Sequence, residues 1–100
     1  MRVIFALPGN EAFAQALAKA GGFELGVLET RRFPDGESYV RLLTDVAGKC
    51  ADLVSTLARP DDGFLSLVFA ADAARDLGAR EVTLVAPYLS YMRQDRRFQP

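Results

Sequence analysis

Short apolar runs alternate along the chain with longer segments in which apolar residues recur at helical spacing, a pattern typical of an α/β domain. The run from Val3 to Leu7 is bounded by Pro8 and Gly9, which indicates a strand buried on both faces. Further strands of the same kind are expected at residues 25–30, 52–57 and 81–86.

Residues 37–43 show the alternation of a strand rather than a continuous apolar run. One side of this strand carries Ser38, Val40 and Leu42, and the other carries Tyr39, Arg41 and Leu43. The dipeptide Asp35-Gly36 before it can supply a tight turn. The pattern therefore predicts a hairpin from Arg31 to Leu43.

Two helices are expected between the strands. In the first, Asn10 is expected to cap the helix with its side-chain oxygen, and Gly21-Gly22 ends it. Its apolar stripe is predicted to consist of Phe13, Ala16, Leu17 and Ala20. In the second, Asp61 or Asp62 is expected to cap a helix over residues 63–77, which Gly78 closes.

The second helix is apolar nearly all round in its first two turns. A helix that covers one face of a sheet needs only one apolar stripe, so this helix is expected to contact a second partner. Two interpretations stay open: a subunit interface, or a position between two layers of a larger chain. The residues concerned are Phe64, Leu65, Leu67, Val68 and Phe69.

Composition restricts the chemistry that this segment can perform. The 100 residues have 50% hydrophobic and 25% charged content, which fits one soluble globular domain, and the net charge of −1 predicts no nucleic-acid or membrane partner. Histidine is absent, so an imidazole base would have to come from elsewhere. Cys50 is the only cysteine, which excludes an intramolecular disulfide and a cysteine zinc site. We expect a cytoplasmic protein, because the first apolar run is too short for a signal peptide.

The segment from Pro87 to Arg97 follows the last expected strand and carries the strongest chemical signal. It holds three arginines, one carboxylate and two tyrosines. Ligands of open α/β sheets lie outside the carboxyl ends of the strands, so a cationic and aromatic loop there could hold a polyphosphate. The alternative is a solvated loop in which Asp95 pairs with an arginine, an arrangement that contributes little to stability.

The expected hairpin carries a second candidate motif, Arg31 to Glu37. Phe33 could stack on a purine base, and the carboxylate of Asp35 or Glu37 could accept a hydrogen bond from an exocyclic amine. The alternative is a polar hairpin tip in which Asp35-Gly36 serves turn geometry and Phe33 lies in the core.

Taken together and in this order, the two motifs resemble those of the ribose-phosphate diphosphokinases, the phosphoribosyl pyrophosphate synthetases. The resemblance covers nearly the whole chain and rests above all on Arg32-Phe33-Pro34-Asp35-Gly36-Glu37 and Tyr91-Met92-Arg93-Gln94-Asp95-Arg96. It implies a three-layer phosphoribosyltransferase-like fold with a mainly parallel sheet and a protruding β-hairpin. Residues 1–100 would then be the N-terminal, ATP-binding-side domain, truncated at the active-site loop.

The resemblance also implies an activity: transfer of the diphosphate of ATP to ribose 5-phosphate, with Mg²⁺, giving phosphoribosyl pyrophosphate and AMP. In such enzymes the hairpin of one subunit reaches over the ATP site of its neighbour, which implies a homo-oligomer. The ATP-binding residues would be Phe33, Asp35, Gly36, Glu37, Arg93 and Gln94. The catalytic loop, the ribose-phosphate loop and the metal ligands are expected after Pro100.

The chain departs from the common family pattern at Ser90, where a glycine is usual, at Met92, where an alanine is usual, and in the segment 60–65. None of these positions is assigned to ATP. Two other interpretations remain: a non-catalytic regulatory or oligomerising paralogue of the same family, and a generic nucleotide-binding module without transfer chemistry.

Overall fold

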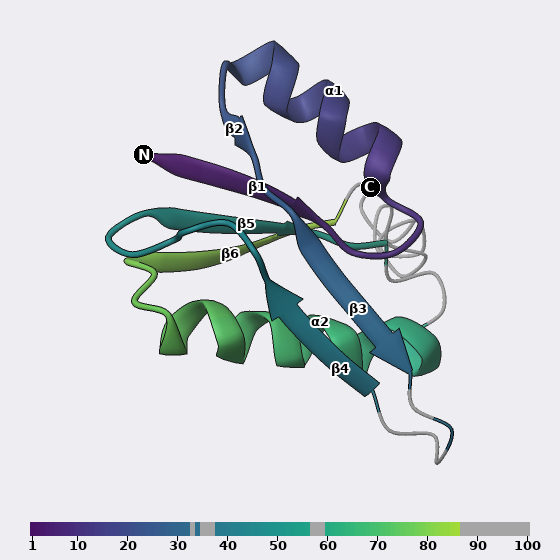
Figure 1. The fold of residues 1–100 in the computed structure, drawn as a ribbon. Coiled ribbons are helices and arrows are strands. Elements are labelled where there is room, and N and C mark those ends of the chain that lie inside the picture. The colour runs from purple at the N-terminus through teal and green to yellow at the C-terminus, as the bar shows by residue number, and fades with distance from the viewer. Residues whose placement is uncertain (33, 35–37, 57–59, 87–100) are drawn as a thin grey trace, which may run out of the picture.

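The computed structural model describes residues 1–32, 34, 38–56 and 60–86. Six strands and two helices follow one another along the chain (Figure 1). They are β1 (Arg2–Ala6), α1 (Glu11–Gly21), β2 (Glu24–Leu25), β3 (Leu28–Arg32), β4 (Ser38–Leu42), β5 (Cys50–Val54), α2 (Pro60–Asp76) and β6 (Glu81–Val85). Among the described residues, no helix combines the length and the apolar character needed to cross a membrane.

The strands form two sheets. Four of them make a parallel sheet in the order β2-β1-β5-β6, and β3 and β4 pair separately as an antiparallel hairpin. Helix α1 lies on one face of the parallel sheet, whereas α2 and the hairpin lie on the other (Figure 1). The predicted three-layer α/β architecture with a mainly parallel sheet and a hairpin is confirmed.

Strand β1 is buried on both faces because its side chains alternate between two clusters. Val3 and Phe5 pack with residues of α2, β5 and the hairpin, and Ile4 packs against α1. Val3, Ile4 and Phe5 each have no exposed surface. A strand of this kind needs apolar residues at consecutive positions, which explains the continuous apolar run.

The hairpin uses the predicted alternation to attach itself to α2. Leu42 is buried and Val40 packs beside it in the cluster that contains Leu67 of α2, whereas Leu43 is exposed. The pairing runs from Leu28 opposite Leu42 to Arg32 opposite Ser38, so the hairpin begins three residues before the predicted Arg31. The proposed Asp35-Gly36 turn lies outside the described residues.

The single strand expected at residues 25–30 is wrong, because the chain breaks at Gly26. Gly26 donates its N–H to the carbonyl of Ile4 at 2.8 Å, which ends the pairing with β1. A Cβ on Gly26 would lie 2.5 Å from the Phe5 ring and 2.7 Å from Cγ1 of Val3. The backbone therefore passes directly over these two side chains before β3 departs to pair with β4.

The apolar stripe predicted for α1 is largely wrong. The helix buries Ala14 and Ala18, with Leu17 partly buried, while Ala16 and Ala20 are exposed. Phe13 keeps 43% of its surface exposed. Small alanine side chains at the contact let the helix lie close to the sheet, a preference that hydrophobicity alone does not reveal.

The ends of the other elements differ from expectation by a few residues. Helix α2 begins at Pro60, so Asp61 and Asp62 lie in its first turn rather than at its cap, and Pro60 suits the first helical position. Gly78 closes the helix as predicted, with φ +89° and a hydrogen bond of 3.0 Å from the Ala79 N–H to the Ala74 carbonyl. Strand β5 begins at Cys50, two residues earlier than expected.

Candidate functional site

The carboxyl ends of β1, β5 and β6 lie at the same edge of the parallel sheet, which is the edge where open α/β sheets bind ligands. Two backbone hydrogen bonds extend the pairing beyond the strands. The N–H of Leu7 donates to the carbonyl of Val54 at 2.9 Å, and the N–H of Ser55 donates to the carbonyl of Val85 at 3.0 Å. The three strand exits are therefore held side by side.

Asn10 adds a side-chain link at this edge. Its Nδ2 donates to the carbonyls of Leu7 and Pro8 at 3.2 and 3.1 Å. Its Oδ1 accepts from the backbone N–H and from the hydroxyl of Thr56 at 3.1 and 2.7 Å. Asn10 occupies the N-cap position of α1, but its side chain makes no capping hydrogen bond, so the predicted capping role is wrong. Its hydrogen-bonding groups are used to join the loop after β1 to the loop after β5.

The residues predicted to bind ATP lie outside the described part of the chain, so their geometry stays a prediction. Arg93 and Gln94 follow β6, and the hairpin residues lie between β3 and β4. These hairpin residues are Phe33, Asp35, Gly36 and Glu37. The described structure provides their attachment points, Arg32, Ser38 and Val85. In Figure 1 the carboxyl ends of β1, β3 and β6 all point toward the right-hand side.

The hairpin strands present cationic side chains to solvent. The Arg31 side chain is 66% exposed and forms a loose ion pair, 3.9 Å from Glu29. Arg41 is also exposed, and its pKa is raised above the ordinary value by a hydrogen bond with Tyr39, by the charge of Tyr39 and by the charge of Glu29. The Arg41 guanidinium therefore stays protonated, which suits an element proposed to approach a polyanionic nucleotide.

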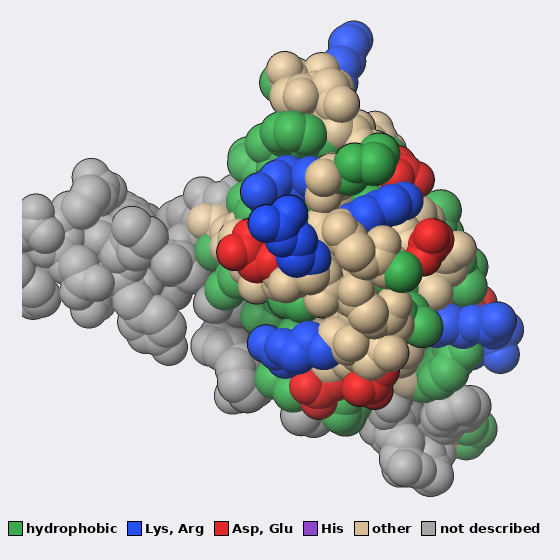
Figure 2. Space-filling model, turned by 90° about the vertical axis from the view of Figure 1, so that its left-hand side faces the viewer, with side chains coloured by type: hydrophobic (Ala, Val, Ile, Leu, Met, Phe, Trp, Pro, Cys, Tyr) green, Lys and Arg blue, Asp and Glu red, His purple; other side chains and the backbone are tan. Residues whose placement is uncertain are grey.

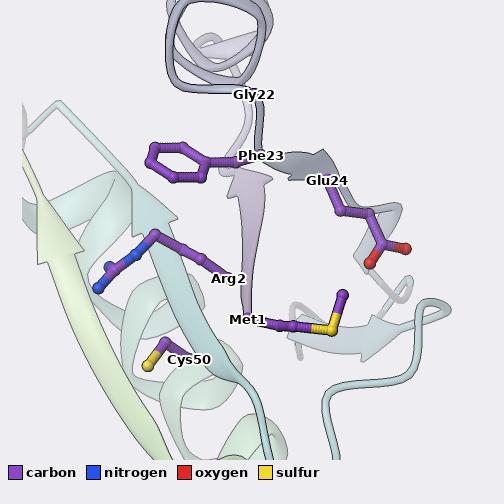
Figure 3. A pocket seen from close by; sticks show the side chains of 6 residues that line it. All are labelled: Met1, Arg2, Gly22, Phe23, Glu24 and Cys50. Atoms are coloured by element: carbon purple, nitrogen blue, oxygen red, sulfur yellow. The ribbon is translucent and has the colours of Figure 1, made fainter.

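A depression of about 360 Å³ lies at the opposite, amino end of the sheet (Figure 3). Its lining consists of Met1, Arg2, Gly22, Phe23, Glu24 and Cys50. Arg2 does not offer a free cation there, because its Nη1 donates to both carboxylate oxygens of Asp52 at 2.6 and 2.7 Å. Its guanidinium also lies 5.9 Å from the centre of the Phe23 ring.

The molecular face that contains the N-terminus carries both positive and negative side chains, which are interspersed (Figure 2). A site for a polyphosphate would need excess positive charge, which this mixed face does not provide. We therefore interpret the residues around the depression at the amino end as structural, and we place the candidate site at the carboxyl edge of the sheet.

The described part of the chain contains no group of three or more His, Cys, Asp or Glu residues that could hold a metal ion. Cys50 lies 3.7 Å from Glu81, measured from its Sγ to Oε1, without a third such partner. The described residues therefore do not fit a protein-bound Mg²⁺ site.

Comparison with known proteins identifies the family. Residues 2–100 match the family model described as the N-terminal domain of ribose phosphate pyrophosphokinase. A ribose-phosphate pyrophosphokinase of Saccharolobus solfataricus is 42% identical over 86 residues, which are 85% of this chain and 30% of that protein. One of Methanopyrus kandleri is 36% identical over 98 residues, which are 98% of this chain and 34% of that protein. The chain thus spans about a third of the length of these relatives.

Solved structures agree with this assignment. The phosphoribosylpyrophosphate synthetase of Mycobacterium smegmatis superposes with a TM-score of 0.78 at 25% identity, over 99% of this chain and 34% of that chain. A purine phosphoribosyltransferase of Pyrococcus horikoshii superposes with a TM-score of 0.68 at 17% identity, over 88% of this chain and 60% of that chain. The second likeness concerns the fold alone.

Proposed function

Because the chain belongs to the ribose-phosphate pyrophosphokinase family and matches the N-terminal domain of that family, we propose that the full-length protein transfers the diphosphate of ATP to ribose 5-phosphate. The products are phosphoribosyl pyrophosphate and AMP. The observation that carries this proposal is the family match over residues 2–100, which includes both sequence motifs assigned to ATP. The fold supports it, since β6 leads directly into the segment with Arg93 and Gln94.

In this proposal the chain supplies the ATP half of the site. The guanidinium of Arg93 holds phosphate oxygens through charge-assisted hydrogen bonds, and Gln94 adds neutral donors. Phe33 stacks on adenine, while Asp35 and Glu37 accept hydrogen bonds from its exocyclic amine, with Gly36 providing the turn. The contribution to catalysis is positioning and charge stabilisation, as is usual for phosphoryl-type transfer. Bound Mg²⁺ would supply neutralisation of phosphate charge, and its ligands are proposed to lie after Pro100.

We further propose that the ATP site is shared between subunits in a homo-oligomer in the cytoplasm. The exposure of apolar side chains on α2 is consistent with a contact to a second subunit. Leu67 is buried in the core, but Phe69 remains 39% exposed and Val68 is only partly buried. Phe64 and Leu65 have side chains outside the described part of the structure. A subunit interface and a position between two layers of a larger chain therefore both stay open as explanations for the apolar surface of α2.

The test is the release of AMP from ATP by the full-length protein, with and without ribose 5-phosphate. We expect release that depends on ribose 5-phosphate and on Mg²⁺, together with a phosphoribosyl pyrophosphate product identified by mass spectrometry. ATP binding without this reaction would contradict the proposal and would indicate the non-catalytic paralogue. Hydrolysis that is independent of ribose 5-phosphate would contradict the assigned acceptor.

A further inference from the structure

Asn10 is linked to two loops at the carboxyl edge, and its orientation follows from its neighbours. The backbone N–H of Thr56 can only donate, so the atom that faces it at 3.1 Å is Oδ1. The carbonyls of Leu7 and Pro8 can only accept, so the atom that faces them is Nδ2. The amide therefore has one orientation that satisfies every partner.

This amide is buried, which makes its hydrogen bonds costly to lose. Asn10 keeps only 7% of its surface exposed. A buried polar group that loses its partner bears the full cost of desolvation, which exceeds the net gain from an ordinary hydrogen bond. Aspartate could keep the acceptor bonds but would place a carboxylate against two carbonyl oxygens. The position thus requires an uncharged group with a donor and an acceptor.

The link continues from Thr56 to the exit of β6. Ser55, next to Thr56 in the chain, donates its N–H to the carbonyl of Val85 at 3.0 Å. Val85 is the last residue of β6, and the segment that contains Arg93 and Gln94 follows it in the sequence. A shift of Thr56 would therefore move Ser55. Through the hydrogen bond between Ser55 and Val85, it would also move the end of β6, after which that segment begins.

We propose that Asn10 is a positioning residue that clamps the loop after β1 to the loop after β5 and thereby sets the exit of β6 for ATP binding. This inference rests on the proposed function for its effect on ATP, whereas the clamp itself is independent of it. Asn10 does not need to touch ATP. It acts through Thr56, Ser55 and Val85.

The test uses the full-length protein with the variants Asn10→Ala, Thr56→Val and Thr56→Ser. Thr56→Val removes the side-chain hydroxyl and preserves the shape of the side chain, whereas Thr56→Ser keeps the hydroxyl. The matched control is Thr44→Val, because the Thr44 hydroxyl, in the link between β4 and β5, accepts an exposed hydrogen bond from the N–H of Val27 at 2.9 Å. Hydrogen exchange is measured in peptides that cover residues 53–56 and 82–86, and the Michaelis constant for ATP is measured in parallel.

We expect Asn10→Ala and Thr56→Val to accelerate exchange in both peptides by about fivefold or more. The same variants should raise the Michaelis constant for ATP several-fold with a smaller change in turnover. Thr56→Ser and Thr44→Val should stay close to wild type in both measurements. If Asn10→Ala does not fold, Thr56→Val provides the same comparison with a smaller perturbation.

Unchanged exchange at residues 82–86, or an unchanged Michaelis constant for ATP in Thr56→Val, would overturn the inference. Failure of the proposed function is distinguishable, because wild-type protein would then release no AMP in response to ribose 5-phosphate. In that event ATP affinity measured by calorimetry replaces the Michaelis constant. An affinity that Thr56→Val leaves unchanged would again overturn the inference.

Discussion

At the scale of single residues, the partners of the Arg2–Asp52 ion pair differ in burial. The Asp52 side chain is 5% exposed and the Arg2 side chain 36% exposed. The hydrogen bond to Asp52 is also the main cause that raises the pKa of Arg2 above its ordinary value. Removal of either partner breaks the same bonds, but only removal of Arg2 leaves a buried charge without compensation.

Arg2→Ala should therefore destabilise the fold more than Asp52→Ala. After Asp52→Ala, the remaining guanidinium can reach water, whereas after Arg2→Ala the remaining carboxylate cannot. The measurement is the midpoint of urea denaturation. Arg75→Ala is the matched control, because its pair with Asp72 is exposed at 63% and 66% and should contribute almost nothing. Equal losses for Arg2→Ala and Arg75→Ala would show that the burial of Asp52 has no energetic consequence.

Arg93→Ala in the full-length protein tests the predicted phosphate contact. Loss of a charge-assisted hydrogen bond costs about 1.5–3 kcal/mol, which corresponds to a tenfold to hundredfold decrease in the ratio of turnover to the Michaelis constant for ATP. Steady-state kinetics with ATP as the varied substrate measures this ratio. Arg75→Ala is the control, because Arg75 lies on α2 in an exposed ion pair with Asp72, outside the residues assigned to ATP. Wild-type kinetics for Arg93→Ala would assign that side chain to a solvated loop.

At the scale of elements, the break between β2 and β3 separates the parallel sheet from the hairpin. Gly26 makes this break possible because its backbone lies against Phe5 and Val3, where no side chain fits. The chain can then leave the plane of the sheet, and β3 pairs with β4 over α2. The position of the hairpin, and hence of its proposed adenine contacts, depends on this close approach.

Gly26→Ala should destabilise the fold by about 1–3 kcal/mol, the usual cost of adding a methyl group to a packed core. Phe5→Leu removes the ring atom that lies 2.5 Å from the added Cβ, so the double variant should lose less stability than the sum of the single variants. Urea denaturation of the four proteins measures this coupling. Gly48→Ala is the control, because its Cβ would meet nothing within 4 Å and its cost would arise only from φ +72°. Strict additivity of Gly26→Ala and Phe5→Leu would contradict the proposed contact.

At the scale of the whole molecule, the described fold provides an edge for a ligand but not a complete reaction site. The chain covers about a third of the length of its relatives. The resemblance assigns the catalytic loop and the ribose-phosphate loop to positions after Pro100. Ribose 5-phosphate and the metal would then be held by parts that residues 1–100 do not contain.

Residues 1–100 alone should therefore form no phosphoribosyl pyrophosphate, whereas the full-length protein is proposed to form it. The assay is AMP release that depends on ribose 5-phosphate, at equal molar concentrations of the two proteins. Circular dichroism must first show that the 100-residue protein is folded. Turnover by these residues alone would show that the acceptor site lies within them.

The proposed sharing of the ATP site between subunits predicts complementation between two impaired variants. Glu37→Ala damages the hairpin and Arg93→Ala damages the phosphate contact, but a mixed oligomer contains some sites in which both elements are intact. For random mixing of dimers, about a quarter of wild-type activity should return on co-expression. The control is a mixture of the separately purified variants before subunit exchange, with sedimentation velocity to confirm assembly. Co-expressed variants no more active than either parent would place the hairpin in the site of its own chain.

The hydrophobic pattern alone predicted the α/β class, the approximate position of β1, β6 and α2, and the hairpin with its alternating side chains. These features follow from local periodicity, because a strand buried on both faces needs a continuous apolar run and a half-buried strand needs alternation. The occurrence of the two chemical motifs in the same chain likewise indicates the family from the sequence alone.

Tertiary contacts decided the remaining features. The split at Gly26 depends on Phe5 and Val3, which are distant in the sequence, and the buried face of α1 depends on how closely the helix approaches the sheet. Asn10 looked like a helix cap because its local sequence permits capping. It instead bonds to Thr56, 46 residues away, because the parallel pairing of β1 with β5 brings their carboxyl ends together. Periodicity describes neighbours along the chain, whereas these roles depend on neighbours that only the folded chain provides.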